Sequence, residues 1–149
     1  MYKIIKISTL VISSMFLVAC DNKKNTDQTS FAEDLTLCQF STGECSKNVA
    51  DISVGLMIDP VHTPSEKPIN ITLKSTQAIT NISMRIEGRD MFMGVIPVSL
   101  SSVTDNEAHG TLIFGSCSSN YMVWRAFVMF DYQNQQRTLI YDFLADNPN

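Results

Sequence analysis

The chain has 149 residues, with eleven basic and fifteen acidic side chains and a formal charge of −4. This length suits one domain that buries a hydrophobic core of its own. An acidic chain without a basic stripe argues against nucleic acid as a partner, because nucleic-acid binding needs clustered Lys and Arg.

The first twenty residues, MYKIIKISTLVISSMFLVAC, predict a targeting segment. Lys3 and Lys6 form a basic start, and residues 7–18 are an apolar run too short for a transmembrane helix. The run ends in LVAC, which resembles the lipobox of bacterial lipoproteins. The resemblance implies that Ala19 fits the cleavage pocket and that Cys20 takes the lipid. An ordinary signal peptide with an incidental cysteine is the alternative.

We therefore expect residues 1–19 to be a cleaved lipoprotein signal peptide and the mature chain to begin at Cys20, with several acyl chains that anchor it stably. In lipoproteins of the enterobacterial type, Asp in the place of Asp21 keeps the protein on the inner membrane, and Asn22 strengthens this expectation. Because species differ in this rule, the outer membrane is the alternative. In both cases the domain would face the periplasm.

The next segment, DNKKNTDQTSFAED, is polar and has no amphipathic stripe. It predicts a flexible tether, so that residues 20–34 comprise the lipidated cysteine and the tether. The remaining chain, 35–149, is expected to be a single β-sandwich domain.

From residue 35 onward, apolar residues recur with the period of two that is typical of strands. The alternating sets are Ile52, Val54, Leu56 and Ile58; Ile69, Ile71 and Leu73; Ile82, Met84 and Ile86; and Ile96, Val98 and Leu100. The series of predicted strands continues in GTLIFGS, YMVWRAFVMFDY and RTLIYDFLA. TDNEAHG and QNQQ are expected to be turns, and Pro97 indicates an edge or bulged strand.

Together these segments predict about seven short strands and no helix with a clear apolar stripe. The expected fold is all-β, an immunoglobulin-like antiparallel β-sandwich, with a small barrel as the alternative. Trp124, on the long apolar strand, is expected to pack near a disulfide, as a tryptophan does in many such sandwiches.

Three cysteines remain after Cys20, namely Cys38, Cys45 and Cys117. Disulfides are expected in the oxidising periplasm, and an odd number leaves one thiol over. Six residues separate Cys38 from Cys45 in CQFSTGEC, and Gly43 would permit the turn that brings them together. A bridge from Cys117 to either of them is the alternative.

Catalytic motifs are not found in the sequence. His62 lies in a proline-rich segment and His109 in the TDNEAHG segment, and neither has the spacing of a metal site such as HExxH. No GxSxG, GxGxxG or P-loop appears, and Cys117 has no neighbouring base that would activate it as a nucleophile. An enzyme is therefore not expected.

Met91 and Met93, in GRDMFMG, are the candidate functional residues. Thioethers and thiolates are soft ligands that select Cu(I), and residues two apart in an extended segment project to one face. Cys117, Met122 or a histidine would complete the site. The alternative is that the pair fills gaps in the core, as Met often does. Gly88, Arg89, Asp90 and Gly94 favour a sheet end or loop, where sites usually lie.

The chain resembles a family of small periplasmic, often lipid-anchored, immunoglobulin-like proteins of proteobacteria. The resemblance lies in three segments, CQFSTGEC, RIEGRDMFMGVIPVSL and FGSCSSNYMVWRAFV. More distantly, the chain is similar to YtkA-like and FixH-like domains, which are associated with copper handling and the assembly of haem–copper oxidases. The resemblance implies that Met91 and Met93 are the signature pair and Cys117 the signature cysteine. Two features depart from it: no H-x-M combination is present, and FixH-type proteins carry a transmembrane helix where this chain carries a lipid signal.

Two functional hypotheses follow. The first is a non-enzymatic, lipid-anchored periplasmic protein that binds Cu(I) or assists assembly of a respiratory or copper-containing envelope complex, with Met91, Met93, Cys117 and Met122 as metal ligands. The second is a metal-free interaction module that docks on an envelope protein through the edge near Pro97 or the loop 59–68.

Overall fold

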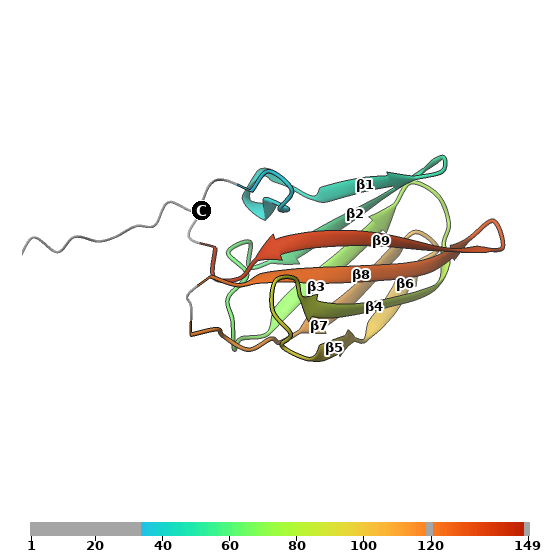
Figure 1. The fold of residues 1–149 in the computed structure, drawn as a ribbon. Helices are drawn as coiled ribbons and strands as arrows, with labels where there is room; N and C mark the ends of the chain where they lie inside the picture. The colour runs from blue at the N-terminus through green and yellow to red at the C-terminus, as the bar shows by residue number, and fades with distance from the viewer. Residues whose placement is uncertain (1–33, 119–120, 148–149) are drawn as a thin grey trace, which may run out of the picture. The chain divides into compact units, whose positions relative to one another are not determined.

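The computed structural model describes residues 34–118 and 121–147, in which nine strands form two antiparallel sheets (Figure 1). One sheet has the order β1-β2-β3-β7-β6 and comprises β1 (Cys45–Val49), β2 (Ile52–Asp59), β3 (Ile69–Ser75), β7 (Glu107–Leu112) and β6 (Leu100–Thr104). The other has the order β5-β4-β8-β9 and comprises β5 (Val95–Val98), β4 (Thr80–Gly88), β8 (Val123–Tyr132) and β9 (Gln135–Leu144). A short 3-10 helix, η1, spans Phe40–Thr42. The expected all-β antiparallel sandwich is thus confirmed.

The expectations for residues 1–33, including the signal peptide, Cys20 and nearly all of the tether, lie outside the described residues. Asp34, the last residue assigned to the tether, is described and makes contacts with the domain that are given below.

The predicted alternation determines which side chains form the core. On β2, Ile52, Val54, Leu56 and Ile58 are all at most 1 % exposed. Burial of apolar surface contributes about 25 cal/mol per Å², so this inward row is a main source of stability. β8, expected to be apolar on both faces, also alternates: its inward residues are buried and its outward ones half-buried.

Aromatic side chains pack the 113–118 segment onto the four-stranded sheet, and a hydrogen bond joins the two sheets. The ring of Phe114 lies 5.2 Å from that of Trp124 and 6.0 Å from that of Phe143, measured between centroids. The hydroxyl of Tyr141, on β9, donates to the carbonyl oxygen of Val54, on β2, at 2.7 Å. Burial raises the pKa of the Tyr141 phenol, so this donor keeps its proton over the whole neutral range.

The segment GVIPVSL forms two strands and not the single one that its alternation predicts. β5 ends at Val98 in the four-stranded sheet, and β6 begins at Leu100 in the five-stranded sheet. The chain therefore crosses between sheets at Ser99. The prediction for Pro97 is confirmed, because β5 is the edge strand of its sheet, where a missing N–H breaks no ladder.

The predicted turn TDNEAHG is mostly strand. The turn itself is confined to Asp105 and Asn106, and β7 begins at Glu107 and ends at Leu112. His109 consequently lies within β7, opposite Thr72. The predicted hairpin turn at QNQQ is correct in place but shorter. It consists of Gln133 and Asn134, which both have positive φ, and the residues on either side of them pair as β8 and β9.

The ends of the strands bring several loops together at one end of the sandwich. β4 ends beside the start of β8, and β3 starts beside the end of β7. The backbone N–H of Asp146 donates to Thr63, and that of Asn147 to His62, at 2.9 Å each. The loops 60–68 and 89–94, the segment 113–118 and the residues after β9 thus share this end, which we call the loop end (Figure 1).

Candidate functional site

The loop that joins β4 to β5, residues 89–94, carries Met91 and Met93 at the loop end. The predicted position at a sheet end is confirmed, but the extended geometry that would direct both side chains to one face is not, because 89–91 are bends and 92–94 have no regular structure. The backbone N–H of Arg89 donates to the carbonyl of Val123 at 2.9 Å, which fixes the start of the loop against β8.

Two of the predicted sulfur atoms are in contact. The thiol of Cys117 donates to the thioether sulfur of Met91, with 3.6 Å between Sγ and Sδ. These residues are 26 positions apart, so the pairing depends on how the 113–118 segment returns over the β4–β5 loop. The Cys38–Cys45 disulfide, the first of the predicted alternatives, closes without Cys117.

Gly88, the last residue of β4, brings a third sulfur residue to the same place. A Cβ built on Gly88 would lie 2.2 Å from the carbonyl oxygen of Met91 and 2.6 Å from the methyl carbon of Met122. Because Gly88 has no side chain, the backbone of Met91 and the methyl group of Met122 can both approach the end of β4. Met91, Cys117 and Met122 are therefore all found around the end of β4.

The four predicted ligand residues differ in their access to solvent. Met122 is buried, at 5 % exposed, whereas Met91 and Met93 are 45 % and 37 % exposed. Cys117 is half-buried. Exposure of both loop methionines argues against the alternative that the pair only fills the core, because a filling residue is enclosed by its neighbours.

The histidines are placed apart from this sulfur group. His109, on the outer face of β7, contacts Glu107 at 2.8 Å, and this hydrogen bond lowers the pKa of Glu107. His62 is exposed in the loop 60–68. Within residues 34–118 and 121–147, no three His, Cys, Asp or Glu side chains are grouped so that they could hold a metal ion. A metal site among these residues would therefore need methionine sulfur as well.

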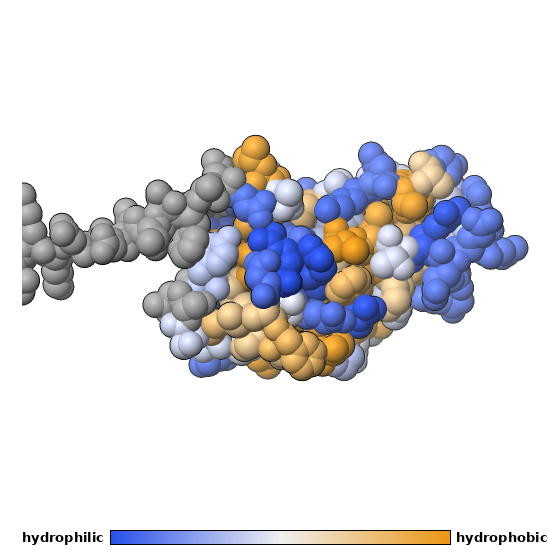
Figure 2. Space-filling model, in the orientation of Figure 1, coloured by the Kyte–Doolittle hydropathy of each residue, from blue (hydrophilic) through white to orange (hydrophobic). Residues whose placement is uncertain are grey.

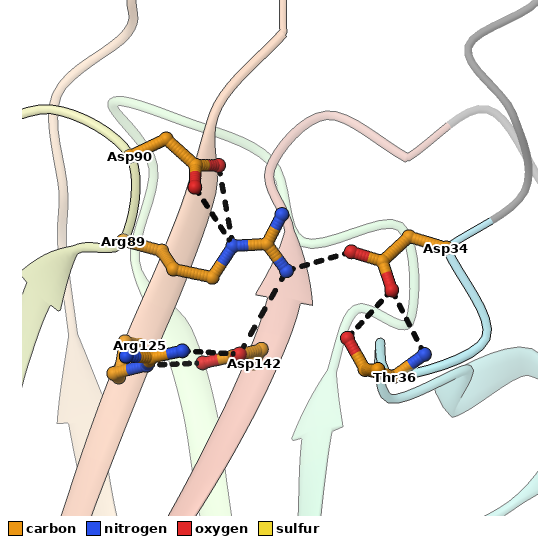
Figure 3. Close-up of polar contacts among 6 residues, drawn as sticks. All are labelled: Asp34, Thr36, Arg89, Asp90, Arg125 and Asp142. Atoms are coloured by element: carbon orange, nitrogen blue, oxygen red, sulfur yellow. Dashed lines mark hydrogen bonds and ion pairs between the residues drawn. The ribbon is translucent and has the colours of Figure 1, made fainter.

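Beside the methionines, an ion-pair network that the sequence did not reveal joins four segments: the one at Asp34, the β4–β5 loop, β8 and β9 (Figure 3). Arg89 bonds Asp34 at 2.7 Å and Asp90 at 3.1 Å, and lies 3.7 Å from Asp142. Arg125 holds Asp142 through two hydrogen bonds, of 2.8 and 2.9 Å. Apart from the adjacent Arg89 and Asp90, these charges come from distant parts of the chain, so no spacing in the sequence indicates this network.

Electrostatics keep Asp34 and Arg89 charged. Hydrogen bonds from Thr36, followed by one from Arg89, lower the pKa of Asp34 to about 2. The hydrogen bonds that Arg89 makes to Asp90 and Asp34 raise its own pKa above the ordinary value for a guanidinium group. Asp34 is thereby attached to Arg89, the first residue of the β4–β5 loop, residues 89–94, which we also call the methionine loop.

The disulfide and the tryptophan also have defined surroundings. Gly43, at φ +132°, allows the reversal between Cys38 and Cys45, as its place in the sequence predicted. Trp124 is fully buried, and the neighbour of its ring is Phe114, an aromatic residue of the 113–118 segment, whereas a disulfide was expected there.

Comparison with known proteins gives a likeness in fold alone. No protein-family model matches the chain, and no curated protein matches it. A solved structure of a DUF4785 family protein from Legionella pneumophila is similar with a TM-score of 0.50 and 15 % identity, over 66 % of this chain and 29 % of that chain. The GAE domain of GGA2p from Saccharomyces cerevisiae has a TM-score of 0.38 and 14 % identity, over 68 % and 96 %. This chain thus spans less than a third of the Legionella protein.

None of the helices in the described part of the chain has the length and apolar character needed to cross a membrane.

Proposed function

We propose that this is a non-enzymatic, lipid-anchored periplasmic protein that binds Cu(I) at the loop end and assists assembly of a respiratory or copper-containing envelope complex. The observation that carries the proposal is the 3.6 Å contact between the sulfur atoms of Met91 and Cys117 at an accessible surface. Met122, which packs at Gly88, and Met93, from the same loop as Met91, would be the further ligands. The resemblance to copper-associated periplasmic domains supports the same function.

The chemistry of these sulfur atoms suits a soft, monovalent ion. Thioether and thiolate ligands select Cu(I), whereas Mg²⁺ and Ca²⁺ prefer oxygen. If each metal–sulfur bond were about 2.3 Å long, as for thiolates on zinc, two sulfurs at the observed separation would subtend about 100° at the metal, close to a tetrahedral angle. The ion would replace the thiol proton, so binding would leave the pair nearly where it is.

Anchoring and compartment are the second part of the proposal. Cys20 follows a lipobox-like LVAC and would carry the lipid, and Asp21 favours the inner membrane. The Cys38–Cys45 disulfide supports an oxidising compartment, since such bonds persist outside the cytosol.

The test is Cu(I) competition with a chromogenic chelator, on the chain from residue 20 with Cys20→Ser, so that the unlipidated N-terminal thiol does not bind copper. Ascorbate keeps copper reduced and leaves the disulfide intact. We expect one Cu(I) to bind, and a Met91→Leu/Cys117→Ser variant to lose affinity by at least about tenfold. Met57→Leu, on β2, is the matched control and should bind as the parent does. Equal binding by the double variant would rule out this site.

A metal-free interaction module is the second candidate function, because β5 is an edge strand with Val95 53 % exposed. Such an edge offers unpaired backbone groups to another chain, and Pro97 limits how far pairing can extend. This candidate predicts no Cu(I) affinity and a specific envelope protein crosslinked from a reagent placed at Val95. Crosslinking that is equal from Val95 and from Val103, on β6, would contradict it.

A further inference from the structure

Exposed apolar side chains are concentrated at the loop end. Among the described residues, eight large hydrophobic side chains are exposed. Four of them, Met91, Phe92, Met93 and Ile113, belong to the segments of the loop end; Val95 begins β5 directly after the 89–94 loop, and Leu35 follows Asp34, which binds Arg89. The other two, Val103 and Ile140, lie elsewhere on the sheets. Figure 2 shows the corresponding orange patch over the region of the β4–β5 loop, next to a blue polar area.

Four of these side chains, Met91, Phe92, Met93 and Val95, follow one another along the chain, and we call them the apolar tip. Phe92 projects furthest, at 86 % exposed. A stable protein interface buries about 800 Å² on each partner, whereas a fully buried aromatic side chain supplies only about 150–250 Å². Four side chains, of which the methionines are less than half exposed, are therefore too few for a dimer interface of ordinary size.

The entry of the chain into the domain lies beside the apolar tip. Arg89, two residues before Met91, holds Asp34 through the 2.7 Å ion pair (Figure 3). Fourteen residues lead from Cys20 to Asp34, a length that reaches at most about 50 Å when fully extended. A lipid at Cys20 would thus pull on the domain at the loop end, next to Phe92.

We propose that the apolar tip contacts the lipid bilayer that holds the anchor, with Phe92 inserted into the interfacial region. This inference rests on the lipid anchoring in the proposed function and goes beyond it, because it orients the domain with the loop end toward the membrane. The sulfur pair Met91–Cys117 would then face membrane-embedded partners. The opposite end, with the β6–β7 and β8–β9 turns, would face the aqueous phase.

Charge distribution agrees with an apolar contact. Asp90 is the exposed charge within the β4–β5 loop, while the side chain of Arg89 is 17 % exposed and its guanidinium group is engaged by three carboxylates. The tip therefore has no basic cluster for anionic headgroups, and the lipid anchor would supply most of the affinity. The contact should accordingly depend little on salt or on the content of anionic lipid.

The experiment uses the full lipidated chain, reconstituted into vesicles of phosphatidylethanolamine and phosphatidylglycerol. A tryptophan reporter is introduced as Phe92→Trp, with Val103→Trp as the matched control at an exposed site beside the β6–β7 turn. Native Trp124 is fully buried and stays as a common background. Bromine-labelled acyl chains quench tryptophan on contact. We expect quenching at position 92 to be at least about twofold stronger than at 103, with emission shifted to shorter wavelength.

Flotation of the vesicles is measured first and tests the anchor alone. A chain that does not float overturns the anchor and, with it, the orientation proposed here, whatever the Cu(I) titration gives. A chain that floats but shows equal quenching at positions 92 and 103 overturns the bilayer contact and leaves the anchor standing. A third measurement follows the emission of the tryptophan at position 92 in detergent without lipid. If this emission shifts with protein concentration, a second copy of the chain covers the apolar tip, and the bilayer contact is overturned.

Phe92→Ser provides a second, independent measurement. A reporter at position 95, introduced as Val95→Trp, should be quenched in the parent chain and at least about twofold less in the chain with Phe92→Ser. Cu(I) affinity should be unchanged in Phe92→Ser, because this residue supplies no sulfur. Unchanged quenching at position 95 would count against insertion of Phe92.

Discussion

Asp34 and Arg89 form a 2.7 Å ion pair that connects the entry of the domain to the first residue of the methionine loop. The two residues are 55 positions apart. Thr36 reinforces the pair by two hydrogen bonds to the same carboxylate, from its hydroxyl and from its backbone N–H (Figure 3). The hydrogen bonds from Thr36 and the ion pair with Arg89 thus hold the same carboxylate. The position of the methionine loop therefore depends on a residue far upstream.

The first prediction concerns acid stability. The pKa of Asp34 is about 2 in the folded chain, against an ordinary 3.8, so the folded state holds the proton less tightly than the unfolded state. The stability from this group is therefore present above pH 4 and is lost as the pH falls through about 2. Asp34→Asn should remove this part of the acid dependence of the urea midpoint. A Thr36→Val variant should shift the loss to higher pH. An equally steep acid dependence in Asp34→Asn would contradict the assignment.

The second prediction concerns Gly88. In Gly88→Ala, the new Cβ would meet the backbone of Met91 and the methyl group of Met122, and backbone atoms cannot move aside as a side chain can. We expect a loss of about 1–3 kcal/mol in unfolding free energy, typical of overpacking, and weaker Cu(I) binding. Gly115→Ala is the matched control, because a Cβ there meets nothing within 4 Å. It should change stability by less than about 0.5 kcal/mol.

The third prediction separates Met122 from the exposed methionines. Met122 is buried against Gly88, so Met122→Leu keeps its volume and removes only the thioether. Stability should change by less than about 1.5 kcal/mol, whereas Cu(I) affinity should fall by at least about tenfold. Met84→Leu, which replaces a buried methionine on β4, should leave the Cu(I) affinity as it is. A Met122→Leu variant with full affinity would show that the site is completed by another ligand.

The fourth prediction concerns the disulfide. Cys38 and Cys45 are seven positions apart, and closing a loop of this length stabilises a protein by about 2–3 kcal/mol through the unfolded chain. The Cys38→Ser/Cys45→Ser variant should lose about this much in urea unfolding. The Cys117→Ser variant should lose less unfolding free energy, because Cys117 is half-buried and closes no disulfide loop. Similar losses in the two variants would mean that local packing, and not loop closure, accounts for the effect.

Local pattern was sufficient for much of the fold. The alternation of Ile52, Val54, Leu56 and Ile58 predicted a strand with one buried face, and each of these residues is buried. Pro97 predicted an edge or bulged strand, because a proline cannot donate to a ladder, and β5 is an edge strand. These inferences concern neighbours in sequence, whose side chains are directed by the period of the backbone.

Where the sequence pattern gave a wrong prediction, the reason lay in the tertiary structure. Alternation continues through Ile96, Val98 and Leu100, yet the chain changes sheets at Ser99, because period alone does not show which sheet a strand joins. Glu107 and His109 belong to β7 and not to a turn, since pairing with β3 overrides their low strand preference.

The sequence by itself determined the class of fold and the position of Met91 and Met93 beside a sheet end, both of which depend on residues close together in the chain. The membrane anchoring that LVAC suggests also depends on a local motif and stays a prediction. Only the tertiary structure decided that Cys38 pairs with Cys45, that Cys117 meets Met91 and that Asp34 meets Arg89. Contacts between distant residues depend on sheet order and loop paths, which are set by the packing of the whole core and leave no local spacing to detect.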